Sequence, residues 1–286
     1  MRAVNAVGLV LHPQRDCGYA VETIATWAHA RGAIVLGCAQ DLGRTTDQAV
    51  VVTPEDLSRR ADLIVSLGGD GTMLRAMRLA AAGHAPVLGV NLGRLGFLAE
   101  IDIPELAPAL AAIDEHRFTT EPRSAVSAVV AGREAVAFND IVLVRRPGHP
   151  SAAISLHVDG HSFVRYLADA VIAATPTGST AYSFSAGGPL VSPSAEGMLV
   201  IPVAPHSAFN RALFLSAGEK LALEVLPTSG ELAVEADGRL VGAARPGDVI
   251  DVAMRPAAAR VIRLGGTTFY QRAQRKLHLT GSAEAE

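Results

Sequence analysis

The stretch LIVSLGGDGTMLRAM, residues 63–77, decides the fold of the N-terminal part of this 286-residue chain. It begins as an apolar run typical of a buried strand, turns at GGDG, and continues with apolar positions at helical spacing. A glycine turn that leads from a strand into a helix is suited to phosphate groups, because the helix N-terminus presents unpaired N–H groups. The stretch therefore predicts an anion site, and yet it places a negative charge, Asp70, in the middle of that site.

The carboxylate of Asp70 is informative because it would repel a polyphosphate unless it bound a cation or accepted a proton. Both tasks belong to phosphoryl transfer, where a carboxylate holds Mg²⁺ or accepts the proton of the attacking hydroxyl. We therefore predict that the backbone of Gly69, Gly71 and Thr72 faces the donor phosphates while Asp70 engages the acceptor hydroxyl. The competing interpretation is a plain tight turn in which Asp70 or Thr72 caps the helix.

On both sides of this stretch, the first hundred residues alternate between strand-like and helix-like segments. Strands are predicted at Ala6–Leu11, Ala33–Leu36, Ala61–Leu67 and Pro86–Val90, and helices at Tyr19–Ala30, Thr72–Ala82 and Pro104–Glu115. Such alternation indicates a mostly parallel sheet covered on both faces. Open sheets of this kind bind ligands at the carboxyl ends of their strands, which is where GGDGT lies.

The pattern changes after about Thr119, where helical periodicity nearly disappears. ISLHVDGHSFVRYL and LAVEADGRLVG each place Asp-Gly between β-rich runs, which is a strong hairpin signal. The tail RVIRLGGTTFYQRAQRKL is typical of a strand followed by a helix. We therefore expect a β-rich, β-sandwich-like domain at residues 120–256, inserted in an α/β domain formed by residues 1–119 and 257–286.

The composition limits the classes of function. The net charge of −3 gives no general attraction to nucleic acid or to anionic membranes, and no apolar run is long enough to span a bilayer. The only lysines are Lys220 and Lys276, and GxxxxGK[ST] does not occur, so a phosphate-loop lysine is excluded. Two cysteines far apart in sequence give neither a disulfide scaffold nor zinc spacing. We expect a cytoplasmic protein that handles phosphates with backbone amides, arginines and a metal ion.

A second polar segment, TPTGSTAYSFSAGG, occupies residues 175–188. Its composition is typical of a solvated loop. However, it follows the apolar run Ala170–Ala174 and contains Tyr182 and Phe184, so we expect partial burial. Small hydroxyl side chains suit ribose and phosphate oxygens, and Tyr182 could stack on a base. The pair Asn139-Asp140 is either a turn or a contact for an adenine edge, which an asparagine amide can match.

These segments together resemble the NAD kinase family, which uses ATP or inorganic polyphosphate to phosphorylate the adenosine-ribose 2′-hydroxyl of NAD. GGDGT alone also occurs in lipid kinases, whereas TPTGSTAY is highly specific. In chain order, the segments that carry the resemblance are GGDGTMLRA (68–76), GVNLGRLGFLAE (89–100), FND (138–140), ATPTGSTAYSFSAGGPLVSP (174–193), PHSAFNRAL (205–213) and VEADG (234–238).

The resemblance implies specific roles for residues of this chain. Asp70 would be the catalytic residue that activates the 2′-hydroxyl, with Gly69, Gly71, Thr72 and Arg75 on the cofactor and phosphate side. The dinucleotide site would be formed by Asn139, Asp140, Asp169, Thr180, Ala181, Tyr182 and Ser185. The resemblance also implies Mg²⁺ or another divalent metal ion, NAD and ATP or polyphosphate as ligands, and a homodimer or homotetramer. No residues are assigned as ligands of a protein-held metal.

The sequence differs from the family pattern at three places. Asp140 stands where glutamate is usual, Ala170 where glycine is usual, and Ala208-Phe209 where Leu-Ser is usual. The first two differences bear on the identity of the acceptor. A paralogous kinase for another nucleotide or nucleoside therefore stays open, as do a GGDGT-type lipid or sugar kinase and a non-catalytic NAD(P)-binding regulator.

Overall fold

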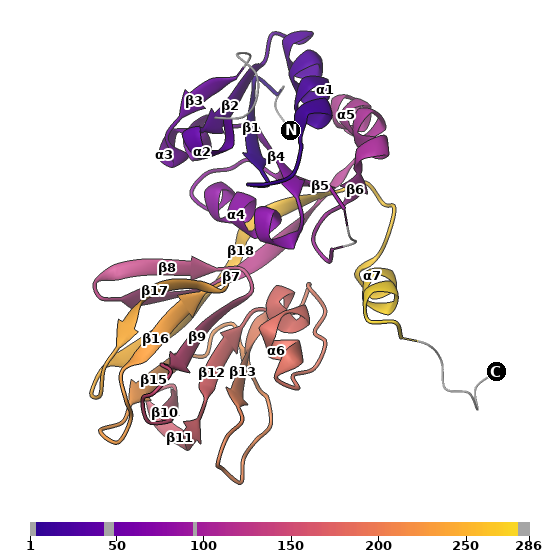
Figure 1. Ribbon diagram of the computed structural model, residues 1–286. Coiled ribbons are helices and arrows are strands. Elements are labelled where there is room, and N and C mark those ends of the chain that lie inside the picture. Colours follow the sequence, from indigo (N-terminus) through magenta and orange to yellow (C-terminus); the bar gives the residue numbers. More distant parts are fainter. Residues whose placement is uncertain (1–3, 43–48, 94–95, 280–286) are drawn as a thin grey trace, which may run out of the picture. The chain divides into compact units, whose positions relative to one another are not determined.

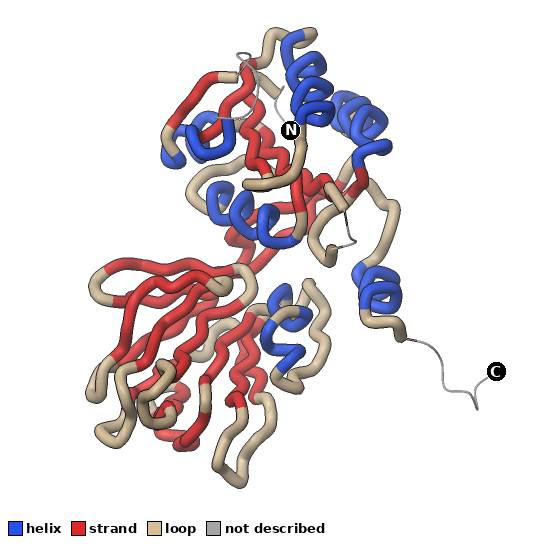
Figure 2. Tube along the Cα trace, in the orientation of Figure 1, coloured by secondary structure: helices blue, strands red, loops and turns tan. Residues whose placement is uncertain are grey.

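The computed structural model describes residues 4–42, 49–93 and 96–279. The chain divides into two compact units, one formed by Met1–Pro122 with Ala259–Glu286 and the other by Arg123–Ala258 (Figure 1). Figure 2 shows helices beside the strands of the first unit and strands almost throughout the second. The predicted fold class is confirmed: an α/β domain, a β-rich domain, and a C-terminal strand and helix that return to the first.

The first unit is built on a parallel sheet with the strand order β3-β2-β1-β4-β5. These strands are β1 (Ala6–Leu11), β2 (Ile34–Cys38), β3 (Val50–Val52), β4 (Leu63–Gly68) and β5 (Val87–Asn91). Two further strands pair with β5 in parallel, namely β6 (Ile101–Asp102) and the end of β18 (Val249–Arg263). All residues of β1 and β4 are buried, as the continuous apolar runs in the sequence predict.

Helices follow most strands of this sheet. They are α1 (Gly18–His29), α2 (Ala39–Leu42), α3 (Pro54–Arg60), α4 (Asp70–Ala80), η1 (Ile103–Glu105), α5 (Leu106–Asp114) and α7 (Phe269–Lys276). The predicted helix over Thr72–Ala82 begins two residues earlier, at Asp70, because the chain enters helical geometry within the glycine turn itself. One face of α1 and α5 packs on the central strands and forms a single apolar core with them.

The second unit consists of two antiparallel layers. One is a six-stranded sheet, and both layers contribute side chains to a shared core. The six strands, in spatial order, are β14 (Leu213–Ser216), β13 (Gly197–Val203), β12 (Ala170–Ala174), β9 (Asp140–Arg145), β16 (Leu232–Ala236) and β17 (Arg239–Ala244). The other layer contains β7 (Thr119–Val130), β8 (Arg133–Ala137), β10 (Ala152–Val158), β11 (His161–Ala168), β15 (Leu221–Val225) and β18.

Both predicted Asp-Gly hairpins are present in this unit. β10 and β11 are joined at Asp159-Gly160, and β16 and β17 at Asp237-Gly238. All four turn residues have positive φ, between 49° and 80°. Two successive left-handed residues give the turn the twist of the flanking strands, and for this reason Asp-Gly marks such turns in a sequence. Across the described part of the chain, no helix is both long and apolar enough to cross a membrane.

Candidate active site

The GGDGT turn joins β4 to α4 at the carboxyl end of the parallel sheet. Gly69 is the N-cap of α4 and Asp70 is its first residue. No side chain caps this helix end, so the interpretation in which Asp70 or Thr72 acts as the N-cap is wrong. Gly68 is required by packing, since a Cβ there would lie 2.2 Å from Oγ1 of Thr72. The turn is therefore compact on its inner side and leaves the Asp70 carboxylate for other partners.

The carboxylate of Asp70 is held by a loop that follows β5. The backbone N–H of Phe97 donates to Oδ2 at 3.1 Å, and that of Leu98 donates to Oδ1 at 3.0 Å. The ammonium of Lys276 lies 3.2 Å from Oδ2. A Cβ on Gly96 would lie 2.2 Å from Oδ1, so this loop can approach the carboxylate only because residue 96 is glycine. Arg94 and Leu95 of the same motif lie outside the described residues.

The outer side of the turn is open. A Cβ added to Gly69 or to Gly71 would meet no atom within 4 Å, so a ligand can approach the backbone there. The amide of Thr72 already donates to the carbonyl of Gly69 at 3.0 Å, and the Thr72 side chain is buried. Nη2 of Arg75 donates to the carbonyl of Leu11 at 2.6 Å and pairs with the buried carboxylate of Asp41. This geometry favours Gly69 and Gly71 over Thr72 as the exposed part of the cradle.

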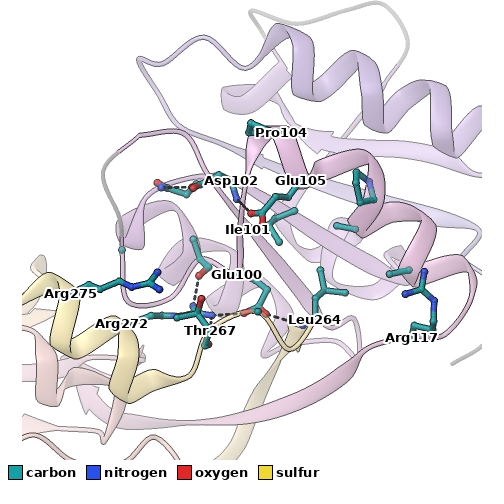
Figure 3. Close-up of a pocket in the computed structure, with 17 residues that line it drawn as sticks. Glu100, Ile101, Asp102, Pro104, Glu105, Arg117, Leu264, Thr267, Arg272 and Arg275 are labelled. Atoms are coloured by element: carbon teal, nitrogen blue, oxygen red, sulfur yellow. Dashed lines mark hydrogen bonds and ion pairs between the residues drawn. The ribbon is translucent and has the colours of Figure 1, made fainter.

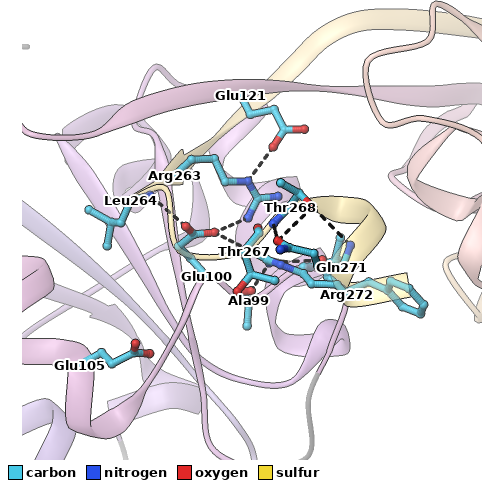
Figure 4. A network of polar contacts seen from close by, with 12 residues as sticks. Ala99, Glu100, Glu105, Glu121, Arg263, Leu264, Thr267, Thr268, Gln271 and Arg272 are labelled. Atoms are coloured by element: carbon cyan, nitrogen blue, oxygen red, sulfur yellow. Dashed lines mark hydrogen bonds and ion pairs between the residues drawn. The ribbon is translucent and has the colours of Figure 1, made fainter. Parts of the chain in front are cut away.

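Helix α7 is fastened to the loop that holds Asp70 by a buried charge network (Figure 4). The carboxylate of Glu100 bonds Arg263 at 2.8 Å and Arg272 at 2.6 Å, and it accepts the amide of Leu264 at 2.9 Å. Arg272 also donates to the carbonyls of Ala99 and Thr267. The side chains of Glu100 and Arg272 are only 2% and 3% exposed, so each charge depends on the other for compensation.

A cavity of about 610 Å³ lies in the same unit, although Asp70 is not among its lining residues (Figure 3). It borders the loop around Gly96 and Glu100, and it is lined by residues of α5, of the segment before α7 and of α7 itself. Three arginines line it, namely Arg117, Arg272 and Arg275. Its wall includes the Glu100 network, so its shape depends on the same contacts that fix α7.

In the second unit, three segments that are distant in sequence meet at Asn139. The amide of Thr175 donates to the carbonyl of Asn139 at 2.8 Å, and the amide of Asn139 donates to Oδ1 of Asp237 at 2.7 Å. A Cβ on Gly178 would lie 2.1 Å from the Asn139 carbonyl oxygen, so the TPTGST segment packs directly on this backbone. The motif pieces FND, TPTGST and EADG therefore lie together in the second unit.

Acidic groups dominate the electrostatics of this constellation. Burial, followed by the charges of Asp237 and Glu235, raises the pKa of Asp140 from 3.8 to about 7. Burial and the charges of Glu235, Asp169 and Asp140 raise the pKa of Tyr182. A carboxyl group that titrates near neutrality can either donate or accept a hydrogen bond. The site therefore suits a ligand that offers hydroxyl and amide groups rather than a bare anion.

The hydroxyl-rich segment is partly buried, as predicted. Thr177, Gly178 and Ser179 lie in the turn η2 (Thr177–Thr180) and are buried, whereas Tyr182 and Ser185 on α6 (Tyr182–Ser185) are exposed. The ring of Tyr182 is 41% exposed and thus available for stacking. Asp169 lies beside β12, and its carboxylate pairs with Arg145. The sequence interpretation as a plain loop is therefore too simple, because η2 and α6 give the segment regular backbone structure.

Within each unit, several of the predicted residues lie close together. Gly69, Asp70, Gly71 and Thr72 form the turn of the first unit, and Asn139, Asp140, Thr180, Ala181 and Tyr182 surround the constellation of the second. Residues that sequence reasoning missed are the partners of Asp70, namely Phe97, Leu98 and Lys276, and the partner of Asn139, Asp237. The sequence gives one indication of Lys276, since it is one of only two lysines and lies in a predicted helix.

Comparison with known families gives matches over most of the chain. Residues 11–118 match the ATP-NAD kinase N-terminal domain, and residues 138–264 match the ATP-NAD kinase C-terminal domain. The two ranges include every residue predicted for the catalytic and cofactor sites. Both the turn and the Asn139 constellation thus lie within the segments that define these domains.

Individual relatives agree with the family match. NAD kinase 1 of Streptomyces avermitilis is 38% identical over 99% of this chain and 89% of its own length. The NAD kinase of Desulforamulus reducens is 34% identical over 96% and 97%.

Two solved structures resemble this fold. Yeast NADH kinase complexed with NADH has a TM-score of 0.84 at 26% identity, covering 98% of this chain and 89% of that one. An NAD kinase from Archaeoglobus fulgidus in complex with ATP has a TM-score of 0.73 at 25% identity, covering 96% and 100%.

Proposed function

The chain belongs to the ATP-NAD kinase family, and on that premise we propose how its own residues transfer a phosphoryl group from ATP to NAD to make NADP. The kinase activity predicted from the sequence follows from membership of the family. The matches to both ATP-NAD kinase domains argue against the lipid or sugar kinase that GGDGT alone would allow. The assignment of steps to residues is our proposal.

Asp70 is proposed to engage the adenosine-ribose 2′-hydroxyl. The hydroxyl oxygen bonds to the γ-phosphorus of ATP, the bond to the bridging oxygen of ADP breaks, and the proton passes to the Asp70 carboxylate. This assignment rests on the position of the Asp70 carboxylate. The amides of Phe97 and Leu98 donate hydrogen bonds to it, and the open glycine turn lies beside it. A base held in position contributes about 10²–10⁴ to the rate of such a step.

The phosphates of ATP are proposed to lie on the open side of the turn. Gly69 and Gly71 support this, because no atoms crowd the positions where their side chains would be. Thr72 shapes the turn through its packing on Gly68, and Arg75 ties α4 to the end of β1 through the carbonyl of Leu11. The N-terminus of an α-helix adds favourable electrostatics for negative charge.

The 120–256 domain is proposed to bind NAD. Asn139 and Asp140 would meet the adenosine half, and Tyr182 would stack on a ring. Asp169, Thr180, Ala181 and Ser185 would complete the contacts with the dinucleotide. The acidic surroundings of Asp140 and Tyr182 support this role, because carboxylates accept hydrogen bonds from ribose hydroxyls.

A divalent metal ion is proposed to accompany ATP. It would neutralise the charge that develops on the phosphates. Among the residues that the structure describes, no group of three or more His, Cys, Asp or Glu side chains could hold a metal ion. Mg²⁺ keeps several waters and binds largely through the substrate phosphates, so it would need few ligands from the protein.

The proposal is tested with a panel of donors and acceptors on the purified protein. ATP and polyphosphate are each combined with NAD or NADH and Mg²⁺, and the 2′-phosphorylated product is measured by chromatography. We expect NADP from ATP and NAD. The yeast relative complexed with NADH makes the NADH arm informative about the acceptor. A folded sample that forms no product from any pair would contradict the proposed function.

We also propose that the protein is a homodimer or homotetramer in the cytoplasm. In support of self-association, the edge strand β11 exposes Phe163 and Leu167, which are 51% and 44% exposed. Light scattering after size exclusion measures the mass directly, and a mass equal to one chain would contradict the proposed assembly. The cytoplasmic location stays a prediction from the sequence.

A further inference from the structure

Lys276 stands out because the sequence excludes a phosphate-loop lysine, and yet the fold brings a lysine to the phosphate turn. It is one of only two lysines in the chain. It lies 206 residues after Asp70 in sequence, at the last position of α7, and its ammonium is 3.2 Å from Oδ2 of Asp70. Its side chain is 34% exposed, so the pair is partly shielded from water. This contact lies within the first unit.

The position of Lys276 is fixed by more than the ion pair. Its ammonium lies 4.5 Å from the centre of the Phe97 ring, a cation–π distance. The backbone of the same Phe97 donates to Asp70. Arg272, one helical turn earlier on the same face of α7, is locked by Glu100 and by loop carbonyls. Lys276 is thus aimed at Asp70 by a buried anchor four residues away.

The hydrogen bonds leave one direction of the carboxylate unused. An ionised carboxylate offers about four acceptor positions, two on each oxygen. Oδ2 receives the amide of Phe97 and the ammonium of Lys276, whereas Oδ1 receives the amide of Leu98. These three donors leave one acceptor position on Oδ1 untaken. The two amides and the ammonium therefore orient the carboxylate and leave this position open.

We propose that Lys276 is a positioning residue for phosphoryl transfer, supplied by α7 in place of a phosphate-loop lysine. Its ammonium holds Oδ2 of Asp70 so that Oδ1 faces the acceptor hydroxyl, and it compensates the carboxylate charge beside the triphosphate. This inference rests on the proposed function of Asp70. Because Lys276 would act through Asp70, we expect substitutions of Lys276 to change kcat rather than the binding of NAD.

The test compares the kinetics of Lys276→Met, Lys276→Arg and Lys220→Met. Lys220→Met is the matched control, since it removes the other lysine, which is exposed and lies in the second unit. We expect Lys276→Met to lower kcat by about tenfold or more, with the KM for NAD changed less than about threefold, because misplacing a catalytic group has effects of this size. Lys276→Arg keeps the charge and the contact with the ring, so we expect kcat within about threefold of the parent. Normal kcat in Lys276→Met, or equal losses in the Met and Arg variants, would overturn the inference.

A double-mutant cycle separates this inference from the proposed role of Asp70. In an Asp70→Asn background, we expect Lys276→Met to change kcat by less than about twofold, because residues that act as a unit are not additive. A full additional loss would show that Lys276 acts independently of Asp70 and would overturn the inference. If Asp70→Asn itself kept a normal rate, the proposed function of Asp70 would be the part that failed.

A spectroscopic readout does not depend on activity. Reductive methylation with ¹³C-formaldehyde labels the two lysine amines and the N-terminal amine and preserves their charge, and the resonances lost in Lys220→Met and in Lys276→Met assign the two lysines. We expect the resonance of Lys276 to shift between the parent and Asp70→Asn, while that of Lys220 stays unchanged. An unchanged Lys276 resonance would show that the contact is absent in solution and would overturn the inference. Circular dichroism confirms that each variant is folded.

Discussion

At the scale of single residues, the chemistry depends on how closely the backbone approaches Asp70. The carboxylate lies so close to Gly96 that a Cβ there would be 2.2 Å from Oδ1, and it receives the amides of the next two residues. The negative charge that looked misplaced in the glycine turn is therefore held by donors from a second loop. Three predictions belong to this scale.

Asp70→Asn is expected to lower kcat by at least about a hundredfold, the lower end for loss of a general base. An amide has almost the same shape as the carboxylate but cannot accept the hydroxyl proton. The measurement is steady-state kinetics with NAD and ATP, with thermal unfolding to verify the fold. A variant with a near-normal rate would remove Asp70 from the mechanism.

Gly96→Ala is expected to lower kcat by about tenfold or more while leaving the protein folded, since small displacements of a catalytic group are costly. The new methyl group would lie 2.2 Å from Oδ1 and 2.9 Å from Cγ of Asp70, so the carboxylate has to move away from its two amides. Gly266→Ala is the matched control, because a Cβ at that position meets no atom within 4 Å. Equal kinetics for the two variants would contradict the close approach.

Asp140→Asn is expected to make the protein more stable at alkaline pH. The folded protein keeps the proton of Asp140 up to a pKa of about 7, whereas a free carboxyl loses it near 3.8. Between these values the folded state binds more protons than the unfolded state, so stability falls as pH rises through this window and then levels off.

Relative to Asp140→Asn, the parent should lose about 2 kcal/mol of unfolding free energy between pH 5 and pH 8. Urea unfolding at the two pH values measures this difference without any ligand. The exposed Asp251→Asn serves as a control for the change from a carboxyl to an amide. A constant gap for Asp140→Asn would show that the buried carboxyl does not titrate near neutrality.

At the scale of elements, α7 owes its place to charge pairing rather than to apolar packing. Only Arg272 and Ala273 of this helix are buried, and its N-terminus is closed by a capping box between Thr268 and Gln271. The guanidinium of Arg272 is buried in the first unit, where the carboxylate of Glu100 compensates its charge. An element of this kind is sensitive to single changes in its counter-charge.

Glu100→Gln is expected to destabilise the protein by about 3 kcal/mol, because it leaves the buried guanidinium of Arg272 without its anion. Glu115→Gln breaks the exposed pair with Arg117 and should cost less than about 1 kcal/mol. Denaturant unfolding of both variants provides the comparison. Equal effects would mean that burial does not distinguish the two ion pairs.

The elements also show where sequence reasoning succeeds. The strand Ala6–Leu11 was predicted to the residue because its apolar run is uninterrupted and completely buried. Strand β3 was missed because it has three residues and is mostly exposed, so neither length nor burial leaves a pattern. Helix α3 was missed although Thr53 and Pro54 give it an N-cap and a first-turn proline.

At the scale of the whole molecule, sequence predicts classes of structure better than it predicts contacts. The change from helical to strand patterning reflects local periodicity, which the chain carries in every segment. The partners of Asp70 lie 27, 28 and 206 residues away. No local pattern fixes such contacts, because they depend on how α7 docks through Arg272. The motif could therefore identify Asp70, but it could not identify the amides and the ammonium that hold it.

The distance of 206 residues between Asp70 and Lys276 has a consequence for biosynthesis. A ribosome that has just translated the glycine turn must add all those residues before the ammonium can reach the carboxylate. A nascent polypeptide therefore contains the residues of the turn long before it can form this ion pair. Products of premature termination upstream of α7 would have the motif and lack the cation.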